Sequence, residues 1–453
     1  MGVNRNSLSI GELVQIEVDS LNYSAHAVGR ADGLVVFVSG GVPGDRLLVK
    51  ITQVKKNYAI AEMAKIISAS PHRCNPPCVH FIEGCGGCQW QHIAYESQIW
   101  WKKEIVRQAL RRIGKLEDIP EIETSKTLPS LHYRSKLRLF PSKSPFSKGG
   151  FRGISEYGIQ LGMRRTGSHE VVPIRECLIS SRLINSLKSL FCGEVLSSGS
   201  VLHEISIRVS DRHQQIMLSC TYDGNDPATA EDIDRLSRLP AVTSVFYRVA
   251  SNAGRSGKFI LGYGNCAISE EVRGIEYKIG PECFFQVNTF GLKTLVDLVS
   301  EFAGEDNQIV LDAHCGVGMF ALQMARVSRD VWGTDVSQSA VKLARSNAAD
   351  NGMDNVHFRT GTVSQLLRDK LWDVPVDTAI LDPPRKGCEK ADLQSLISSR
   401  PGKVVYVSCN PTTLARDLHD LKNAGYRLLR LAMVDMFPMT YHLETVALCV
   451  RTV

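Results

Sequence analysis

Apolar and polar positions repeat along this chain with periods that change from one region to the next. Within residues 9–67, short runs rich in Val, Ile and Leu alternate with turns of Gly, Pro and Asp. These runs cover residues 13–18, 33–38, 46–51 and 58–63. Evenly spaced short strands are typical of a small β-barrel. We therefore predict an amino-terminal barrel over residues 1–68.

Residues 69–284 mix helical and strand-like periods. Residues 95–113 have the pattern of an amphipathic helix, with an apolar stripe and basic residues elsewhere. The stripe comprises Tyr95, Ile99, Val106, Leu110 and Ile113, and the basic residues are Lys102, Lys103, Arg107, Arg111 and Arg112. From residue 131, strand-like segments alternate with a few helices, and a basic loop at 141–153 interrupts them. The pattern predicts a central α+β domain, whose first helix we expect to pack on the domain that follows.

From residue 285 the chain alternates regularly between strands and helices, which indicates an open parallel sheet. Residues 308–312 form a predicted strand, residues 313–318 a tight turn, and a helix begins at Met319. The fold class that we predict is therefore multidomain. An OB-like β-barrel and a central α+β domain precede an α/β Rossmann-like domain at residues 285–453.

The first turn of this sheet has the residues of a nucleoside-cofactor site. Gly316 and Gly318 allow the backbone to approach a ligand, and Asp335, 17 residues after Gly318, ends the second strand with a carboxylate for ribose hydroxyls. Gly316-x-Gly318-x-x-Ala321 also satisfies the dinucleotide fingerprint, so the turn fits both NAD and S-adenosylmethionine. The later sequence Asp382-Pro-Pro ends a buried strand and makes a rigid turn beside the crevice. Methyltransferases that act on planar bases use such a turn, and dehydrogenases have no evident need of it.

Cys409 lies between a predicted strand and a predicted helix. The stretch 403–411 begins with five residues rich in Val and Tyr that predict a buried strand. Asn410 is a natural N-cap, and Pro411 suits the first helical position. The positive end of a helix favours a thiolate over a thiol. A lone cysteine after an apolar strand is more often a core residue, but the neighbouring motifs favour a nucleophile here.

Composition and charge narrow the class of protein. The 453 residues are 43% hydrophobic, enough for two or three domains with real cores. No apolar run is long enough to span a membrane and the amino end has no signal-peptide pattern, so we expect a cytoplasmic protein with no membrane partner. Residues 95–175 carry 16 Lys and Arg against 8 Asp and Glu, whereas the whole chain has a net charge of +6. A concentrated basic segment suits nucleic acid, although it is also compatible with a merely solvated surface.

Thirteen cysteines in a cytoplasmic protein favour metal ligands or nucleophiles over disulfides. Cys85 and Cys88 form a C-x-x-C pair with glycines between them, and Cys74 and Cys78 lie just upstream. These four thiolates could hold zinc locally. A distant fourth ligand, for which Cys177 is the best candidate, would favour an iron–sulfur cluster instead.

Two resemblances extend these predictions. The stretch from Tyr23 to Val38, followed by Val42-Pro-Gly-Asp, resembles the TRAM domain, an OB-like RNA-binding module. Ala25 and Ala27 occupy positions that are often Gly in that domain. The chain as a whole resembles the RNA uracil-C5-methyltransferase family through five motifs in order. They are Phe285-Gln-Val-Asn288, Asp312 to Phe320, Asp382-Pro-Pro-Arg-Lys-Gly387, Ser408-Cys-Asn-Pro411 and Phe437-Pro-x-Thr-x-His-x-Glu444.

The family resemblance implies a reaction and its residues. It implies methyl transfer from S-adenosylmethionine to carbon 5 of a uridine in structured RNA. Carbon 5 of uracil is a weak nucleophile until a thiolate adds to carbon 6, which is the role implied for Cys409. Glu444 is implied as the base that removes the carbon 5 proton. Cofactor contacts are implied for Gln286, His314, Asp335 and Asp382.

This chain departs from the family pattern at a few positions. His314 stands where Tyr or Phe is usual, Met319 where Asn is sometimes found, and Asp335 where Glu is usual. Cluster-containing relatives use C-x₅-C-x₂-C with a distant cysteine, whereas here six residues separate Cys78 from Cys85. The resemblance implies that a [4Fe-4S] cluster is held by Cys78, Cys85, Cys88 and Cys177, with Cys74 as an additional thiol.

We expect the substrate to be large-subunit (23S) ribosomal RNA, ahead of the tRNA T-loop, since a TRAM domain with a cluster is found in ribosomal RNA members. The target base must lie in a loop or be flipped out, because a base in a helix cannot expose both faces. No obligate protein partner is expected. The alternatives are an RNA-binding protein without catalysis, which the intact Cys409, Asp382 and Glu444 oppose, and a nicotinamide oxidoreductase.

Overall fold

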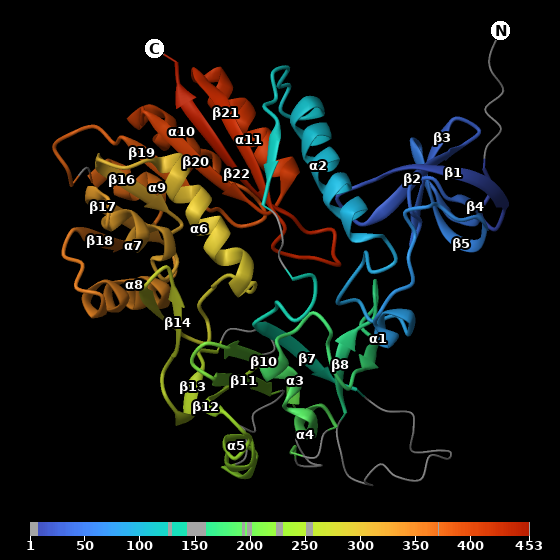
Figure 1. Ribbon diagram of the computed structural model, residues 1–453, viewed down its shortest axis with the longest axis horizontal. Helices are drawn as coiled ribbons and strands as arrows, with labels where there is room; N and C mark the ends of the chain where they lie inside the picture. The colour runs from blue at the N-terminus through green and yellow to red at the C-terminus, as the bar shows by residue number, and fades with distance from the viewer. Residues whose placement is uncertain are drawn as a thin grey trace.

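The computed structural model describes residues 8–125, 129–142, 160–192, 195–196, 202–222, 230–250, 257–369 and 371–452. Most of the basic loop predicted at 141–153 lies outside these residues. The predicted fold class is confirmed: an amino-terminal barrel and a central sheet accompany a larger carboxyl-terminal α/β sheet (Figure 1). In the part of the chain that is described, no helix is both long and apolar enough to cross a membrane.

The amino-terminal barrel is closed by five strands in the order β1-β2-β3-β5-β4. The strands are β1 (Leu13–Leu21), β2 (His26–Ala31), β3 (Leu34–Ser39), β4 (Arg46–Val54) and β5 (Tyr58–Ser68). The sequence patterns predicted four of them and missed β2, which contains Ala, Gly and Arg in place of a hydrophobic run. Gly29 makes this strand possible, because a Cβ there would lie 2.5 Å from the Glu17 carbonyl oxygen of β1.

One short helix, one long helix and one strand connect the barrel to the rest of the molecule. They are α1 (Val79–Ile82), α2 (Tyr95–Arg112) and β6 (Ile122–Thr124). As expected, α2 packs on the carboxyl-terminal domain, where it contacts α11 (Pro411–Asn423), and it lies between that domain and the barrel (Figure 1). The helical pattern placed Lys102 off the apolar stripe, but its side chain is fully buried and pairs with Asp435 at 2.7 Å.

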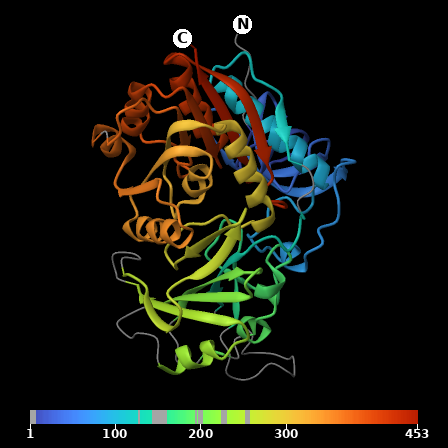
Figure 2. The same ribbon diagram turned by 60° about the vertical axis from the view of Figure 1, so that its left-hand side comes forward.

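The central domain is built on a seven-stranded sheet in the order β13-β12-β11-β10-β7-β8-β9. Its strands are β7 (Lys136–Pro141), β8 (Leu161–Arg164), β9 (Val171–Pro173), β10 (Leu202–Ser210), β11 (Gln215–Tyr222), β12 (Val242–Val249) and β13 (Ile260–Gly264). Its helices are α3 (Arg182–Asn185), α4 (Lys188–Phe191) and α5 (Ala230–Ser237). The sheet has its own hydrophobic core, and in Figure 2 it lies below the carboxyl-terminal domain.

A two-stranded hairpin follows the central sheet. It consists of β14 (Ile268–Val272) and β15 (Ile275–Ile279), and its apolar residues join the core beneath α6, α7 and α8. The hairpin therefore lies between two domains: β14 contacts β10 and β11 of the central sheet, and β15 contacts α7 and α8.

The carboxyl-terminal sheet has eight strands in the order β18-β17-β16-β19-β20-β22-β21-β6. Its strands besides β6 are β16 (Asn307–Ala313), β17 (Ser328–Asp335), β18 (Val356–Thr360), β19 (Thr378–Leu381), β20 (Lys403–Ser408), β21 (Tyr426–Val434) and β22 (Glu444–Arg451). Its helices besides α11 are α6 (Thr289–Ala303), α7 (Met319–Ala325), α8 (Gln338–Asp350), α9 (Val363–Asp369) and α10 (Lys390–Ser399). Strands β16 to β20 run parallel, whereas β22 runs antiparallel between β20 and β21.

Both faces of this sheet are covered by helices. Helices α6, α7 and α8 share one core with one face, and α2, α9, α10 and α11 share another core with the opposite face. Strand β20 contributes to both: Val404 and Tyr406 belong to one core, and Val405 and Val407 to the other. This alternation, combined with full burial, explains why β20 has an unbroken run of apolar residues.

Candidate active site

Cys409 occupies the turn between β20 and α11, as the sequence predicts. Asn410 is the N-cap of α11, and its side-chain oxygen accepts a hydrogen bond of 3.0 Å from the Thr412 amide. Its side-chain amide also donates to the Arg385 carbonyl at 2.8 Å. The turn is therefore fixed both to its own helix and to the segment after β19.

The order of strands in the sheet brings two carboxyl groups to this cysteine. Asp382 directly follows β19, which is parallel to β20 on one side. Glu444 begins β22, which is antiparallel to β20 on the other side and pairs Thr445 with Ser408. The carboxyl ends of β19 and β20 thus meet the amino end of β22. Asp382, Cys409 and Glu444 converge at one edge of the sheet although 62 residues separate the first from the last.

The surroundings of the thiol favour its protonated form. Burial above all, with the nearby Glu444 and Asp382 carboxyl groups, raises the pKa of the Cys409 thiol to about 12, and Arg385 acts in the opposite direction. From the sequence, the position of Cys409 at the start of α11 was expected to favour its thiolate form. In the protein without ligands, burial beside carboxyl groups outweighs that effect.

The two carboxyl groups influence each other. Burial, followed by the nearby Asp335, raises the pKa of Asp382 to about 7. Burial and Asp382 raise the pKa of Glu444 well above its ordinary value, against the lowering effect of Arg385. Glu444 is only 2% exposed. Buried carboxyl groups with raised pKa values are characteristic of acid–base sites.

Arg385 and His442 complete this part of the site. One terminal guanidinium nitrogen of Arg385 lies 3.3 Å from the His442 Nε2 and 3.4 Å from its Nδ1. Burial, then Arg385 and Lys102, lower the pKa of His442 to about 3, so its ring is neutral. Neither residue was singled out as a site residue from the sequence, although both belong to motifs that the sequence analysis recognised.

The cofactor turn lies at the same edge of the sheet. Gly318, with φ of 90°, begins α7, and a Cβ there would lie 2.5 Å from Leu322. Asp335 accepts hydrogen bonds from the Gly316 amide at 3.0 Å and from the Ser337 amide at 2.8 Å. The carboxylate therefore fixes the glycine turn as well as facing the crevice.

Two buried polar atoms at this turn lack a partner among the described residues. One is Nδ1 of His314, a residue held in the left-handed region with φ of 66°. The other is Oδ1 of Asp312, whose Oδ2 accepts from the Ala321 amide at 2.8 Å. Burial raises the pKa of Asp312 and lowers that of His314. Unpaired buried polar atoms beside a glycine turn fit a polar nucleoside ligand such as S-adenosylmethionine.

Gln286 is buried two residues before Asn288, the N-cap of α6. The Asn288 side chain donates to the Met436 carbonyl at 3.1 Å, which ties this segment to the loop before Glu444. The hydrogen bonds found within the described ranges include none from the Gln286 side chain. Its predicted contact with the cofactor stays a prediction.

The four cysteines predicted to hold a cluster line one common cavity. Cys78, Cys85, Cys88 and Cys177 all line a cavity of about 260 Å³. Burial is the main cause that raises the pKa of Cys85 to about 11 and that of Cys88 to about 12, and the neighbouring thiols act in the same direction. Gly86 permits the tight turn, since a Cβ there would lie 2.7 Å from the Arg164 carbonyl oxygen.

Cys74 is exposed and does not line this cavity; its sulfur lies 3.4 Å from the Gln91 carbonyl oxygen. The local zinc set with Cys74 is thus less favoured than the set with Cys177. Over the ranges that the structure covers, no three Cys, His, Asp or Glu side chains are arranged to hold a metal ion as they stand.

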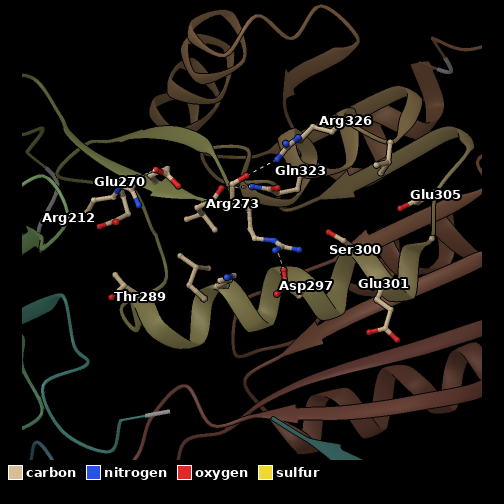
Figure 3. Close-up of a pocket in the computed structure, with 16 residues that line it drawn as sticks. Arg212, Glu270, Arg273, Thr289, Asp297, Ser300, Glu301, Glu305, Gln323 and Arg326 are labelled. Atoms are coloured by element: carbon tan, nitrogen blue, oxygen red, sulfur yellow. Dashed lines mark hydrogen bonds and ion pairs between the residues drawn. The ribbon is translucent and has the colours of Figure 1, made fainter. Parts of the chain in front are cut away.

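A larger cavity of about 1130 Å³ lies along α6, away from these residues (Figure 3). Its lining is charged, and much of the charge is internally paired. Arg273 forms an ion pair with Asp297 at 2.6 Å, and Arg326 donates to the Arg273 carbonyl at 2.7 Å. Since it contains none of Cys409, Asp382 or Glu444, its size does not make it the reaction site.

Comparison with known proteins identifies the family of the chain and its amino-terminal domain. Residues 258–452 match the family described as tRNA (Uracil-5-)-methyltransferase, and residues 8–64 match the TRAM domain. An uncharacterized RNA methyltransferase of Caldanaerobacter subterraneus subsp. tengcongensis is 34% identical over 98% of this chain and 100% of its own length. Another from Nostoc sp. is 34% identical over 97% of this chain and 96% of its own length.

A solved structure is similar over nearly the whole chain. It is the Pyrococcus abyssi tRNA (uracil-54, C5)-methyltransferase in complex with S-adenosyl-L-homocysteine. Its TM-score is 0.71 and its sequence identity 26%, with 96% of this chain and 100% of that chain covered. The similarity therefore includes the barrel and the central domain as well as the carboxyl-terminal sheet.

Proposed function

Because this chain belongs to the tRNA (uracil-5-)-methyltransferase family of S-adenosylmethionine-dependent RNA methyltransferases, we propose that it methylates carbon 5 of a uridine through a covalent bond to Cys409. The observation that carries the mechanism is the convergence of Cys409, Asp382 and Glu444 at one edge of the sheet. The competing assignment to a nicotinamide oxidoreductase is wrong, given the family of the chain.

The first step activates the base. The Cys409 thiolate bonds to carbon 6 of uracil, and the electron pair of the C5=C6 bond moves to the ring carbonyl as an enolate, which makes carbon 5 nucleophilic. Because the pKa of Cys409 is raised at rest, loss of the thiol proton must be coupled to substrate and cofactor binding. Arg385 favours the thiolate that results.

S-adenosylmethionine supplies an electrophilic methyl group, and its positive charge favours ionised carboxyl groups nearby. After carbon 5 has taken up the methyl group, the ring still holds its carbon 5 proton and the enzyme's sulfur. Glu444 accepts that proton, the C–H electron pair re-forms the C5=C6 bond, and the sulfur leaves as thiolate. The products are 5-methyluridine and S-adenosyl-L-homocysteine, with Cys409 free again and the carbon 5 proton on Glu444.

Four residues are proposed to bind the cofactor: Gln286, His314, Asp335 and Asp382. Asp335 is supported by its position after β17 and by its hydrogen bond to Gly316. His314 is supported by its unpaired Nδ1. Asp382 directly follows β19, precedes two prolines, and neighbours both Asp335 and Glu444.

We also propose that Cys78, Cys85, Cys88 and Cys177 hold a [4Fe-4S] cluster. The support is their common cavity and the soft thiolate donor set, which suits iron–sulfur clusters. Anaerobically purified protein should contain iron and acid-labile sulfide. Cys177→Ala should lower the iron content, while Cys74→Ala should leave it unchanged. Stoichiometric zinc without sulfide would contradict the cluster.

The proposed substrate is a uridine of 23S ribosomal RNA, methylated in the cytoplasm, where RNA and free thiols occur together. The combination of a TRAM domain with the four cysteines supports this choice. The tRNA T-loop is the second candidate, because the similar Pyrococcus abyssi enzyme acts on tRNA uracil-54.

The mechanism is tested with RNA that contains 5-fluorouridine, whose fluorine cannot leave as a proton. Native enzyme should form a stable protein–RNA complex in the presence of S-adenosylmethionine, and Cys409→Ala should form none and show no turnover. S-adenosyl-L-homocysteine binding to Cys409→Ala serves as the folding control. Normal turnover in Cys409→Ala would rule out the covalent mechanism. Mapping of 5-methyluridine in 23S and transfer RNA treated with the enzyme separates the two substrates.

A further inference from the structure

A tyrosine of the amino-terminal barrel contacts the turn that carries Cys409. Tyr23 lies between β1 and β2, and its hydroxyl donates a hydrogen bond to the main-chain carbonyl of Cys409, 386 residues later in the chain. The barrel thus reaches the reaction edge of the carboxyl-terminal sheet directly. Neither the TRAM assignment nor the family motifs predict this contact.

The turn that carries Tyr23 is tightly braced. The Asn22 side-chain oxygen accepts hydrogen bonds from the Ser24 amide at 2.8 Å and from the His26 amide at 3.0 Å. Ala25 has a left-handed backbone with φ of 65°, and its amide donates to the Asn22 carbonyl at 3.2 Å. Tyr23 is therefore presented by a defined turn that links two barrel strands.

The ring of Tyr23 has a defined partner as well. It packs edge to face on Tyr441, with ring centroids 5.6 Å apart and an interplanar angle of 84°. Tyr441 in turn lies 4.1 Å from the ring of His442, which neighbours Arg385. Tyr23 thus belongs to a cluster of contacting aromatic rings to which both the barrel and the loop before Glu444 contribute.

The hydrogen bond reaches the carbonyl group of the peptide that follows the nucleophile. The neighbouring groups of the turn are held from within the carboxyl-terminal domain: the Ser408 hydroxyl accepts from the Asn410 amide at 3.1 Å, and Asn410 binds Arg385. Within the described part of the chain, the Cys409 carbonyl has its hydrogen-bond donor in Tyr23. Burial raises the pKa of the Tyr23 phenol, so it remains a donor at any pH of enzymatic work.

We propose that Tyr23 is a positioning residue for the nucleophile: its hydrogen bond orients the peptide that follows Cys409 and so directs the sulfur toward carbon 6 of the bound uracil. The barrel then forms part of the active site in addition to any role in holding RNA. This inference rests on the proposed role of Cys409.

Tyr23→Phe tests the hydroxyl while it keeps the ring on Tyr441. The expected result is a fall in kcat of about three- to tenfold, the effect of one lost hydrogen bond, with the KM values for RNA and S-adenosylmethionine unchanged. The rate of complex formation with 5-fluorouridine RNA should fall by the same factor. Titration with S-adenosyl-L-homocysteine measures the fraction of enzyme that binds the cofactor product. A fall in kcat caused by partial unfolding can therefore be told apart from one caused by the lost hydrogen bond.

Tyr58→Phe is the matched control, since it removes the hydroxyl of another barrel tyrosine, one that packs on Phe37 with ring centroids 5.4 Å apart. It should retain native kcat and native trapping rate. Tyr23→Ala, which also loses the ring contact, should fall at least as far as Tyr23→Phe.

Two results would overturn the inference. One is an unchanged kcat and trapping rate in Tyr23→Phe. The other is a raised KM for RNA at unchanged kcat, which would make Tyr23 an RNA contact. Failure of native enzyme to form the 5-fluorouridine complex would instead overturn the proposed mechanism, so the two failures are distinguishable.

Discussion

The resting site holds its nucleophile in the inactive protonation state. With a pKa near 12, the Cys409 thiol is protonated at neutral pH, and burial raises the pKa of Glu444 well above its ordinary value. The thiol must lose its proton to act as the nucleophile, against the effects of burial and of two carboxyl groups, and Glu444 must be ionised to accept a proton. Reaction is therefore expected only after RNA and cofactor have changed the charges around the turn. Such a site protects a reactive thiol from oxidation between turnovers.

Glu444→Gln separates the two halves of the proposed reaction. The amide keeps the shape of the carboxyl group but cannot accept the carbon 5 proton, so a methylated protein–RNA adduct should accumulate and turnover should fall about 100-fold or more. Denaturing gels and mass spectrometry of the RNA-bound protein measure the adduct. The exposed Glu389→Gln, on the N-cap of α10, is the control. Loss of turnover without adduct would assign the base elsewhere.

Asp382 should make the free energy of unfolding decrease as pH rises, whereas most carboxylates make it increase. Its pKa is raised to about 7, so the folded protein binds a proton that the unfolded chain releases at lower pH. The free energy of unfolding should therefore decline as pH rises from about 4 to about 7, by on the order of 4 kcal/mol from this group.

Asp382→Asn should remove most of that decline in urea unfolding between pH 4 and 8. The control is Asp350→Asn, because hydrogen bonding to Lys278 lowers the pKa of that carboxyl. An undiminished decline in Asp382→Asn would assign the pH dependence to another group.

At the scale of helices and strands, features that depend on neighbouring residues could be predicted from the sequence, whereas contacts between residues far apart in the chain could not. The place of β20, the Asn410 cap and Pro411 at the start of α11 all follow from neighbouring residues, and the structure has them where predicted. Strand β2 was missed because its residues are weak strand formers. The burial of Lys102 was missed because its partner Asp435 lies 333 residues away. Arg385 with His442, and Tyr23 with Cys409, are likewise contacts that no local pattern encodes.

Helix α2 should depend strongly on Lys102. Its ammonium group is fully buried, 2.7 Å from Asp435 and 3.1 Å from the Phe437 carbonyl oxygen. Lys102→Ala leaves Asp435 buried without its cation, which should cost about 3–5 kcal/mol of unfolding free energy. Lys103→Ala, on a less buried face of the same helix, should cost less than about 0.5 kcal/mol. Equal losses in the two variants, measured by urea unfolding, would contradict a specific role for the buried pair.

At the scale of the whole molecule, the barrel and the carboxyl-terminal sheet share one hydrophobic core. That core runs from the barrel through α2 to the face of the sheet covered by α9, α10 and α11. The central sheet has a separate core of its own. The barrel is thus held against the catalytic half by packing as well as by Tyr23, which lets one part of the molecule hold RNA while the other presents Cys409.

RNA binding should weaken steeply with salt. Residues 95–175 carry a surplus of 8 positive charges, and each phosphate that they neutralise releases counterions on binding. Raising KCl from about 50 to 200 mM should lower RNA affinity by at least about tenfold. Fluorescence anisotropy with labelled RNA measures the effect, and S-adenosyl-L-homocysteine affinity over the same range is the control. A flat salt response of RNA binding would contradict phosphate-dominated recognition.

The path of the chain through α2 and β6 determines how the central sheet is attached. These elements join the catalytic half before the central sheet begins, and β15 packs on α7 and α8 after it ends. The central sheet is therefore held to the catalytic half both where the chain enters it and where the chain leaves it, so movement of this sheet as a unit is restrained at two points.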